Sequence, residues 1–182
     1  MPSEFIPIIV VLLRFFIPFT ILRFPLLGGI LALLADATDI MIFEAFGYGS
    51  FLSNFSYHSL DKVFDTWYLF FEFLVVLKWA DVLARKTGII LFGWRFIGFL
   101  AFMIFGLREA LFFAPNIFEY FFLAMLIVWK FNKKFKLKIK SLIIILLVVG
   151  IPNIIKEYIM HFRYPDQTWV WFRDNVFWWL YD

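Results

Sequence analysis

The chain contains no cysteine and only two histidines. Without cysteine there can be no disulfide, no thiolate metal site and no cysteine nucleophile. Two histidines are too few for a multi-histidine metal site within one chain. The P-loop, the glycine-rich dinucleotide turn and the HExxH helix of zinc proteases are also missing. Carboxylates, amides, lysines and arginines are therefore the main groups left for binding or catalysis.

Charged residues are also scarce, at 17% of the chain against 64% hydrophobic and 24% aromatic residues. Soluble domains carry roughly 25% charged residues, so this chain lacks the polar side chains that a water-facing surface needs. We therefore expect an integral membrane protein whose main partner is the lipid bilayer. The net charge of +3 comes with lysines gathered in one short loop. Membrane topology explains such a loop, so no nucleic-acid partner is expected.

Five apolar segments reach the length of roughly 20 residues that a membrane-spanning helix needs. They are residues 24–46, 66–84, 88–107, 110–130 and 141–160. Backbone groups in lipid must be hydrogen-bonded within their own segment, which predicts helices. The expected fold is an all-α polytopic transmembrane bundle of five firm spans. Residues 1–164 would form this transmembrane domain.

A sixth segment, residues 5–22, is apolar but contains Arg14 at its middle and Pro18. It can span the membrane if Arg14 pairs with an acid on a neighbouring helix. It can instead lie in the interface, with the Arg14 side chain reaching the headgroups. The sequence leaves both arrangements open.

The lysine-rich loop at residues 130–140 predicts the orientation, because short cytoplasmic loops are enriched in lysine and arginine. Counting back through alternating spans also places Arg23, Arg85 and Lys86 on the cytoplasmic side. The expected location is the cell membrane. Residues 165–182, rich in tryptophan, would form an aromatic interfacial tail on the non-cytoplasmic side.

Ionisable side chains inside spans are the natural candidates for function, because each costs about 2.5 to 3.5 kcal/mol at the bilayer centre. Asp36 and Asp39 are three residues apart and share one helix face, where they could bind a divalent cation or hold a proton. On the next helix Asp61, Asp65, Tyr68, Glu72 and Trp79 form an acidic and aromatic stripe. The alternative is that each acid neutralises an arginine from another helix.

Later helices add further polar groups at middle to outer depth. Arg95 and Lys156 could hold a phosphate-bearing headgroup. Pro115 and Pro152 each remove a backbone donor and free an upstream carbonyl. We expect one outward-facing pocket lined by Asp36, Asp39, Asp65, Tyr68, Glu72, Arg95, Asn116, Glu119, Asn153, Lys156 and Glu157.

Three classes of function fit these features. The first is a transporter or flippase-like protein for a small polar, cationic or lipid-linked substrate. The second is a membrane-embedded enzyme acting on a lipid, with the acids as metal ligands or as acid and base groups. The third is an accessory subunit whose buried charges are structural ion pairs. The sequence assigns neither a catalytic residue nor an oligomeric state.

Overall fold

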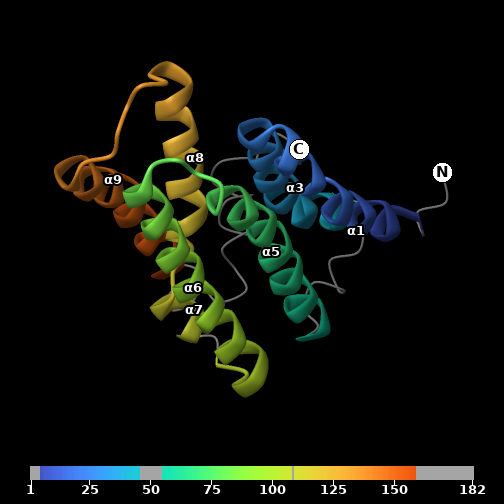
Figure 1. Ribbon diagram of the computed structural model, residues 1–182. Helices are drawn as coiled ribbons and strands as arrows, with labels where there is room; N and C mark the ends of the chain where they lie inside the picture. Colours follow the sequence, from blue (N-terminus) through green and yellow to red (C-terminus); the bar gives the residue numbers. More distant parts are fainter. Residues whose placement is uncertain (1–4, 46–54, 108, 159–182) are drawn as a thin grey trace.

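The computed structural model describes residues 5–45, 55–107 and 109–158, and the predicted tail at 165–182 lies outside these ranges. The described residues are all-helical and contain no strand, so the predicted fold class is confirmed for them (Figure 1). The helices are α1 (Ile6–Phe16), α2 (Phe19–Arg23), α3 (Pro25–Ala45), α5 (Phe55–Val76), α6 (Val82–Phe105), α7 (Glu109–Phe113), α8 (Ile117–Phe131) and α9 (Ile139–Tyr158).

Within the described ranges, four helical segments are long and apolar enough to cross a membrane: Ile6–Arg23, Val82–Phe105, Glu109–Phe131 and Ile139–Tyr158. The N-terminal segment that the sequence left open is one of them. Their outer faces carry exposed apolar side chains such as Ile90 (69%) and Phe105 (70%), which suits contact with lipid. These findings support membrane integration. The prediction of five firm spans and a sixth goes beyond them.

The helices α3 and α5 are not among these four segments; α3 carries Asp36 and Asp39, and α5 carries Asp61, Asp65 and Glu72. The predicted boundaries of α5 also differ from the observed ones, since the helix begins at Phe55 and ends at Val76, not at 66 and 84. A turn follows, and α6 begins after Asp81, whose side chain accepts a hydrogen bond from the Ala84 amide at 3.0 Å. An aspartate in this position is a common helix N-cap, and it is the sequence signal for this boundary.

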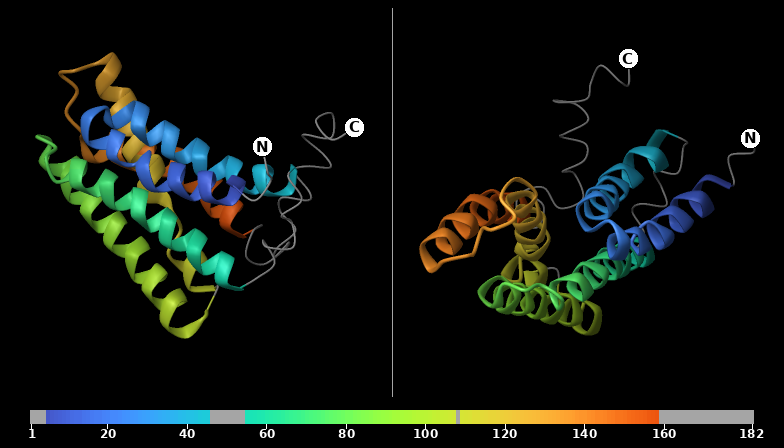
Figure 2. Two further views of the ribbon diagram at one scale, coloured as in Figure 1. Left: turned by 90° about the vertical axis from the view of Figure 1, so that its right-hand side faces the viewer. Right: turned by 45° about the horizontal axis from the view of Figure 1, so that its top comes forward.

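The helix α8 packs against α3, α5, α6 and α9 (Figure 2). Its inward side chains Phe118, Phe121 and Phe122 are fully buried. The nearly continuous segment of α1 and α2 lies against α3 and α5 on the other side of the molecule. The acidic faces of α3 and α5 are therefore turned toward α1.

Two glycines allow helices to come unusually close. A Cβ at Gly28 would lie 2.5 Å from the backbone nitrogen of Ile21, where α3 folds back against α2. A Cβ at Gly98 would lie 2.4 Å from the Ala114 Cβ, where α6 meets the end of α7. Close helix packing therefore accounts for a glycine at position 98.

Candidate functional site

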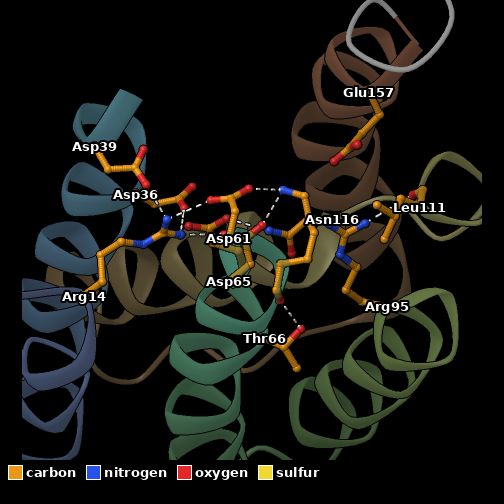
Figure 3. Close-up of polar contacts among 12 residues, drawn as sticks. Arg14, Asp36, Asp39, Asp61, Asp65, Thr66, Arg95, Leu111, Asn116 and Glu157 are labelled. Atoms are coloured by element: carbon orange, nitrogen blue, oxygen red, sulfur yellow. Dashed lines mark hydrogen bonds and ion pairs between the residues drawn. The ribbon is translucent and has the colours of Figure 1, made fainter. Parts of the chain in front are cut away.

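The most highly charged part of the structure surrounds the guanidinium of Arg14 (Figure 3). Arg14 donates through Nη2 to Asp36 and through Nη1 to Asp39, both on α3. It also donates to Asp61 at 2.7 Å and to Asp65 at 2.9 Å, both on α5. We call the set of Arg14, Asp36, Asp39, Asp61, Lys62 and Asp65 the acidic centre.

Lys62 supplies the second cation of the acidic centre. Its Nζ lies 2.9 Å from an oxygen of Asp61 and 2.7 Å from an oxygen of Asp65. Four carboxylates thus face one arginine and one lysine. If all six groups are ionised, four carboxylates against two cations give these six residues a net charge of −2.

Local sequence spacing builds this arrangement. Asp36 and Asp39 are three residues apart on α3, and Asp61 and Asp65 are four apart on α5, so each pair lies on one helix face. The Arg14 side chain is only 6% exposed. Its guanidinium also lies 5.4 Å from the centroid of the Phe64 ring, which adds a cation–π contact.

Two cavities adjoin Arg14. An apolar groove of about 230 Å³ runs between α1, α3 and α5 and reaches Arg14, Asp39 and Asp61. A much smaller cavity of about 10 Å³ lies between Arg14 and Tyr68. The smaller one is near the size of a single water molecule.

A second polar group lies deeper along α5. The glutamate pair, Glu72 on α5 and Glu119 on α8, is almost completely buried, at 0% and 2% exposed. Neither oxygen of Glu72 has a hydrogen-bond partner among the described residues. Glu119 accepts one hydrogen bond from the Asn116 amide at 2.7 Å. Tyr68 lies one helical turn from Asp65 and one from Glu72 on the same face of α5, between the acidic centre and the glutamate pair.

Arg95 on α6 serves the break between α7 and α8. Pro115 lacks an amide hydrogen, which leaves the carbonyl of Leu111 without its usual helical donor. Arg95 Nη1 donates to the Leu111 carbonyl at 3.2 Å and to the Ala114 carbonyl at 2.9 Å. The predicted freeing of a carbonyl at Pro115 is therefore observed, and a protein side chain satisfies it.

The polar residues of α9 form a third group. Asn153 is 3% exposed, and both atoms of its amide lack a partner in the part of the chain described. The Lys156 Nζ lies 3.4 Å from the Tyr120 hydroxyl and 4.0 Å from a Glu157 oxygen. Glu157 is also buried, at 4% exposed.

The predicted site residues thus fall into separate groups. Asp36, Asp39 and Asp65 belong to the acidic centre, while Tyr68, Glu72, Asn116 and Glu119 lie deeper along α5 and α8. Arg95 holds the helix break, and Asn153, Lys156 and Glu157 share α9. The single shared pocket stays a prediction. The predicted set omitted Arg14, Asp61 and Lys62, although an arginine inside an apolar segment was a usable signal.

Carboxylate oxygens of Asp36, Asp61 and Asp65 lie within 4.8 Å of one another, which is close enough to hold a metal ion. Asp39, which the sequence paired with Asp36 as a candidate metal ligand, is not in this group of three. Comparison with protein-family models, curated proteins and solved structures gives no match to this chain. The functional argument therefore rests on the geometry of these residues.

Proposed function

We propose that the protein is an integral membrane transporter that exchanges protons for a small cation through the acidic centre and the glutamate pair. The observation that carries the proposal is the fully buried Glu72, neither of whose carboxylate oxygens has a hydrogen-bond partner among the described residues, close along α5 to the four carboxylates around Arg14. A carboxylate in a medium of low dielectric constant is costly unless a cation or a proton neutralises it. Buried carboxylates in excess are therefore sites at which protons and cations compete.

The proposal includes a topology of six crossings in the cell membrane. Ile6–Arg23, α3, α5, α6, the α7–α8 segment and α9 would each cross, with the loop at 130–140 in the cytoplasm. The ion pairs of Arg14 support including the first three, because they neutralise the charges that α1, α3 and α5 would otherwise carry into lipid. The acidic centre then lies in the outer half of the bilayer.

The route that we propose runs along α5. A cation or proton enters the acidic centre from the outer side, and Tyr68 links this centre to the glutamate pair. The small cavity between Arg14 and Tyr68 can hold a water molecule that relays a proton. Glu72, which has no partner among the described side chains, is the inner proton acceptor.

Proteoliposomes containing a trapped pH-sensitive dye test the proposal. A pulse of external sodium or potassium should release protons from wild-type vesicles faster than from empty ones. Glu72→Gln should slow this exchange by about tenfold or more, because the inner acceptor is lost. Glu109→Gln, which removes an exposed acid of α7, should leave the rate within about twofold. Wild-type vesicles no faster than empty ones, or equal rates for the two variants, would reject the proposal.

A metal-dependent membrane enzyme is a second candidate, and the convergence of Asp36, Asp61 and Asp65 favours it. The apolar groove that reaches Arg14 would suit a lipid substrate. The same carboxylates already bind Arg14 and Lys62, so a metal ion would have to displace those cations. Stoichiometric binding of Mn²⁺ to the purified protein, lost in Asp61→Asn, would favour the enzyme over the transporter.

An accessory subunit is the third candidate, and the ion pairs of the acidic centre favour it because each aspartate there contacts Arg14. The glutamate pair disfavours it, since neither glutamate forms an ion pair within the described ranges. If Glu72→Gln leaves exchange unchanged and the protein copurifies with a fixed partner, the accessory function would replace the transporter.

A further inference from the structure

A basic pocket lies at the opposite end of α5 from the acidic centre. It has a volume of about 960 Å³ and lies between the turn that follows α5 and the loop that joins α8 to α9. Lys78 contributes from the turn, and Lys133, Lys134 and Lys136 contribute from the loop. At 1.5 Å rise per residue, about 20 Å of helix separates Lys78 from Asp65. The basic pocket is therefore distinct from the site of the proposed function.

Asp81 joins the two sides of this pocket. One of its carboxylate oxygens accepts from the Ala84 amide at 3.0 Å, and the other accepts from the Leu137 amide at 2.7 Å. The indole of Trp129 donates to the Phe135 carbonyl at 3.1 Å and fixes the loop from within. The loop is thus held against the turn by defined bonds, so the pocket is part of the folded structure.

The charge of the pocket is unbalanced. Asp81, the acid in its lining, already uses both oxygens to bind backbone amides. Lys78, Lys133, Lys134 and Lys136 form no ion pair with any residue in the ranges that the structure describes. Among the described residues, four lysines and one aspartate therefore line one cavity, and this excess of positive charge favours an anionic ligand.

The aromatic and apolar side chains in and near the pocket indicate the chemical class of the anionic ligand. The rings of Trp79 and Trp129 line the pocket and meet edge to face at 4.8 Å. The Trp79 indole nitrogen is buried and has no hydrogen-bond partner among the described residues. Close to the lining residues along the chain, Phe131, two residues after Trp129, is 85% exposed, and Ile139, two residues after Leu137, is 69% exposed. Apolar side chains so exposed on a membrane protein face lipid, and tryptophans gather at the headgroup level.

Lysines in a cytoplasmic loop are expected on topological grounds alone. That explanation accounts for their number, but it does not require a concave pocket, a hydrogen bond between the loop and the turn, or a lysine on the turn. The structure has each of these features.

We propose that the basic pocket binds the phosphate headgroup of an anionic phospholipid from the adjacent leaflet. The lysines neutralise the phosphate, and Trp79 and Trp129 flank the glycerol region, while the acyl chains leave the pocket past Phe131 and Ile139. A volume of about 960 Å³ lies at the upper end of the usual range for small-molecule sites, which suits a headgroup with its glycerol.

Native mass spectrometry of the full chain in non-ionic detergent tests this proposal, with phosphatidylglycerol and phosphatidylcholine as probes. The test variant combines Lys133→Gln, Lys134→Gln and Lys136→Gln. The matched control combines Lys130→Gln, Lys138→Gln and Lys140→Gln, which removes three lysines near the ends of the same loop but outside the pocket. Both variants are first compared with wild type by circular dichroism and by melting temperature.

We expect the wild-type protein to bind phosphatidylglycerol at least about tenfold more tightly than phosphatidylcholine. The test variant should lose at least about tenfold of the affinity for phosphatidylglycerol, and the control less than about threefold. Equal losses in the two variants would overturn the proposal, because they would show diffuse attraction to a basic loop. Inorganic phosphate that displaces the lipid at equal concentration would overturn the lipid assignment and identify a soluble phosphate ligand.

Discussion

At the scale of single residues, the acidic centre depends on the shape of one side chain. The guanidinium of Arg14 presents several N–H donors in a planar fork, which lets one cation bond to carboxylates on two helices. A lysine at this position would offer a compact charge without the fork. The arginine therefore joins α1 to α3 and α5 in a way that no other residue type can match.

Arg14→Gln should lower the free energy of unfolding by about 3 to 5 kcal/mol, because it leaves buried aspartates without their cation. Arg23→Gln, which removes an exposed arginine from α2, should change it by less than about 0.5 kcal/mol. Unfolding by a denaturing detergent, followed by circular dichroism, measures both values.

A triple variant tests whether the stability lost in Arg14→Gln comes from aspartates left without a cation. Adding Asp36→Asn and Asp39→Asn to Arg14→Gln removes two of the acids that lost their partner, so it should recover part of the lost stability. If Arg14→Gln and Arg23→Gln prove equally stable, the ion pairs of Arg14 do not hold the helices together.

Sequence analysis could predict that Arg14 pairs with an acid but not which acids it would contact. Its partners lie between 22 and 51 residues away along the chain. Contacts over such separations depend on how whole helices pack, and spacing within one helix carries no information about that. The spacing rule did find Asp36 and Asp39 on one face, since both lie on the same helix.

At the scale of helices, charge neutralisation explains why α5 begins earlier than predicted. The residues 55–65 look polar in isolation because they contain Asp61, Lys62 and Asp65. These three side chains are paired with one another or with Arg14, so the segment can be helical despite its charges. Hydropathy judged one segment at a time cannot include a counter-charge on another helix.

The contact between α6 and the end of α7 gives a matched pair of glycine substitutions. Gly98→Ala should destabilise the protein by about 1 to 3 kcal/mol, because its Cβ would lie 2.4 Å from the Ala114 Cβ. Gly93→Ala should be neutral or stabilising by up to about 1 kcal/mol, because no atom lies within 4 Å of the added Cβ.

Melting temperatures of the two glycine variants in the same detergent measure the difference. If Gly98→Ala and Gly93→Ala have the same melting temperature, α6 and α7 are not in tight contact. Both variants replace a glycine of α6 by alanine, so the gain in helix propensity is the same in each. A difference between their melting temperatures therefore reports the local packing.

At the scale of the whole molecule, the absence of native cysteine allows a direct test of the proposed topology. Lys134→Cys should react with a membrane-impermeant maleimide in inside-out vesicles but not in right-side-out vesicles. Glu109→Cys should show the opposite pattern, because the α6–α7 turn would face outward.

If both cysteines are labelled from the same side, the α7–α8 segment that lies between them does not cross the membrane as proposed. The cysteine-free parent protein is the control, since it should not be labelled in either preparation. The two substituted positions are exposed, so neither change should disturb the fold.

The ion pairs of Arg14 also bear on how the protein enters the membrane during synthesis. Arg14 emerges from the ribosome well before Asp61 and Asp65, which follow it by 47 and 51 residues. Until α3 and α5 have been made, the first segment carries an arginine whose partners do not yet exist. If α3 and α5 cross the membrane as proposed, stable insertion of α1 would wait until roughly the first third of the chain has been made. The helices α1, α2, α3 and α5 would then enter the bilayer as one cooperative unit.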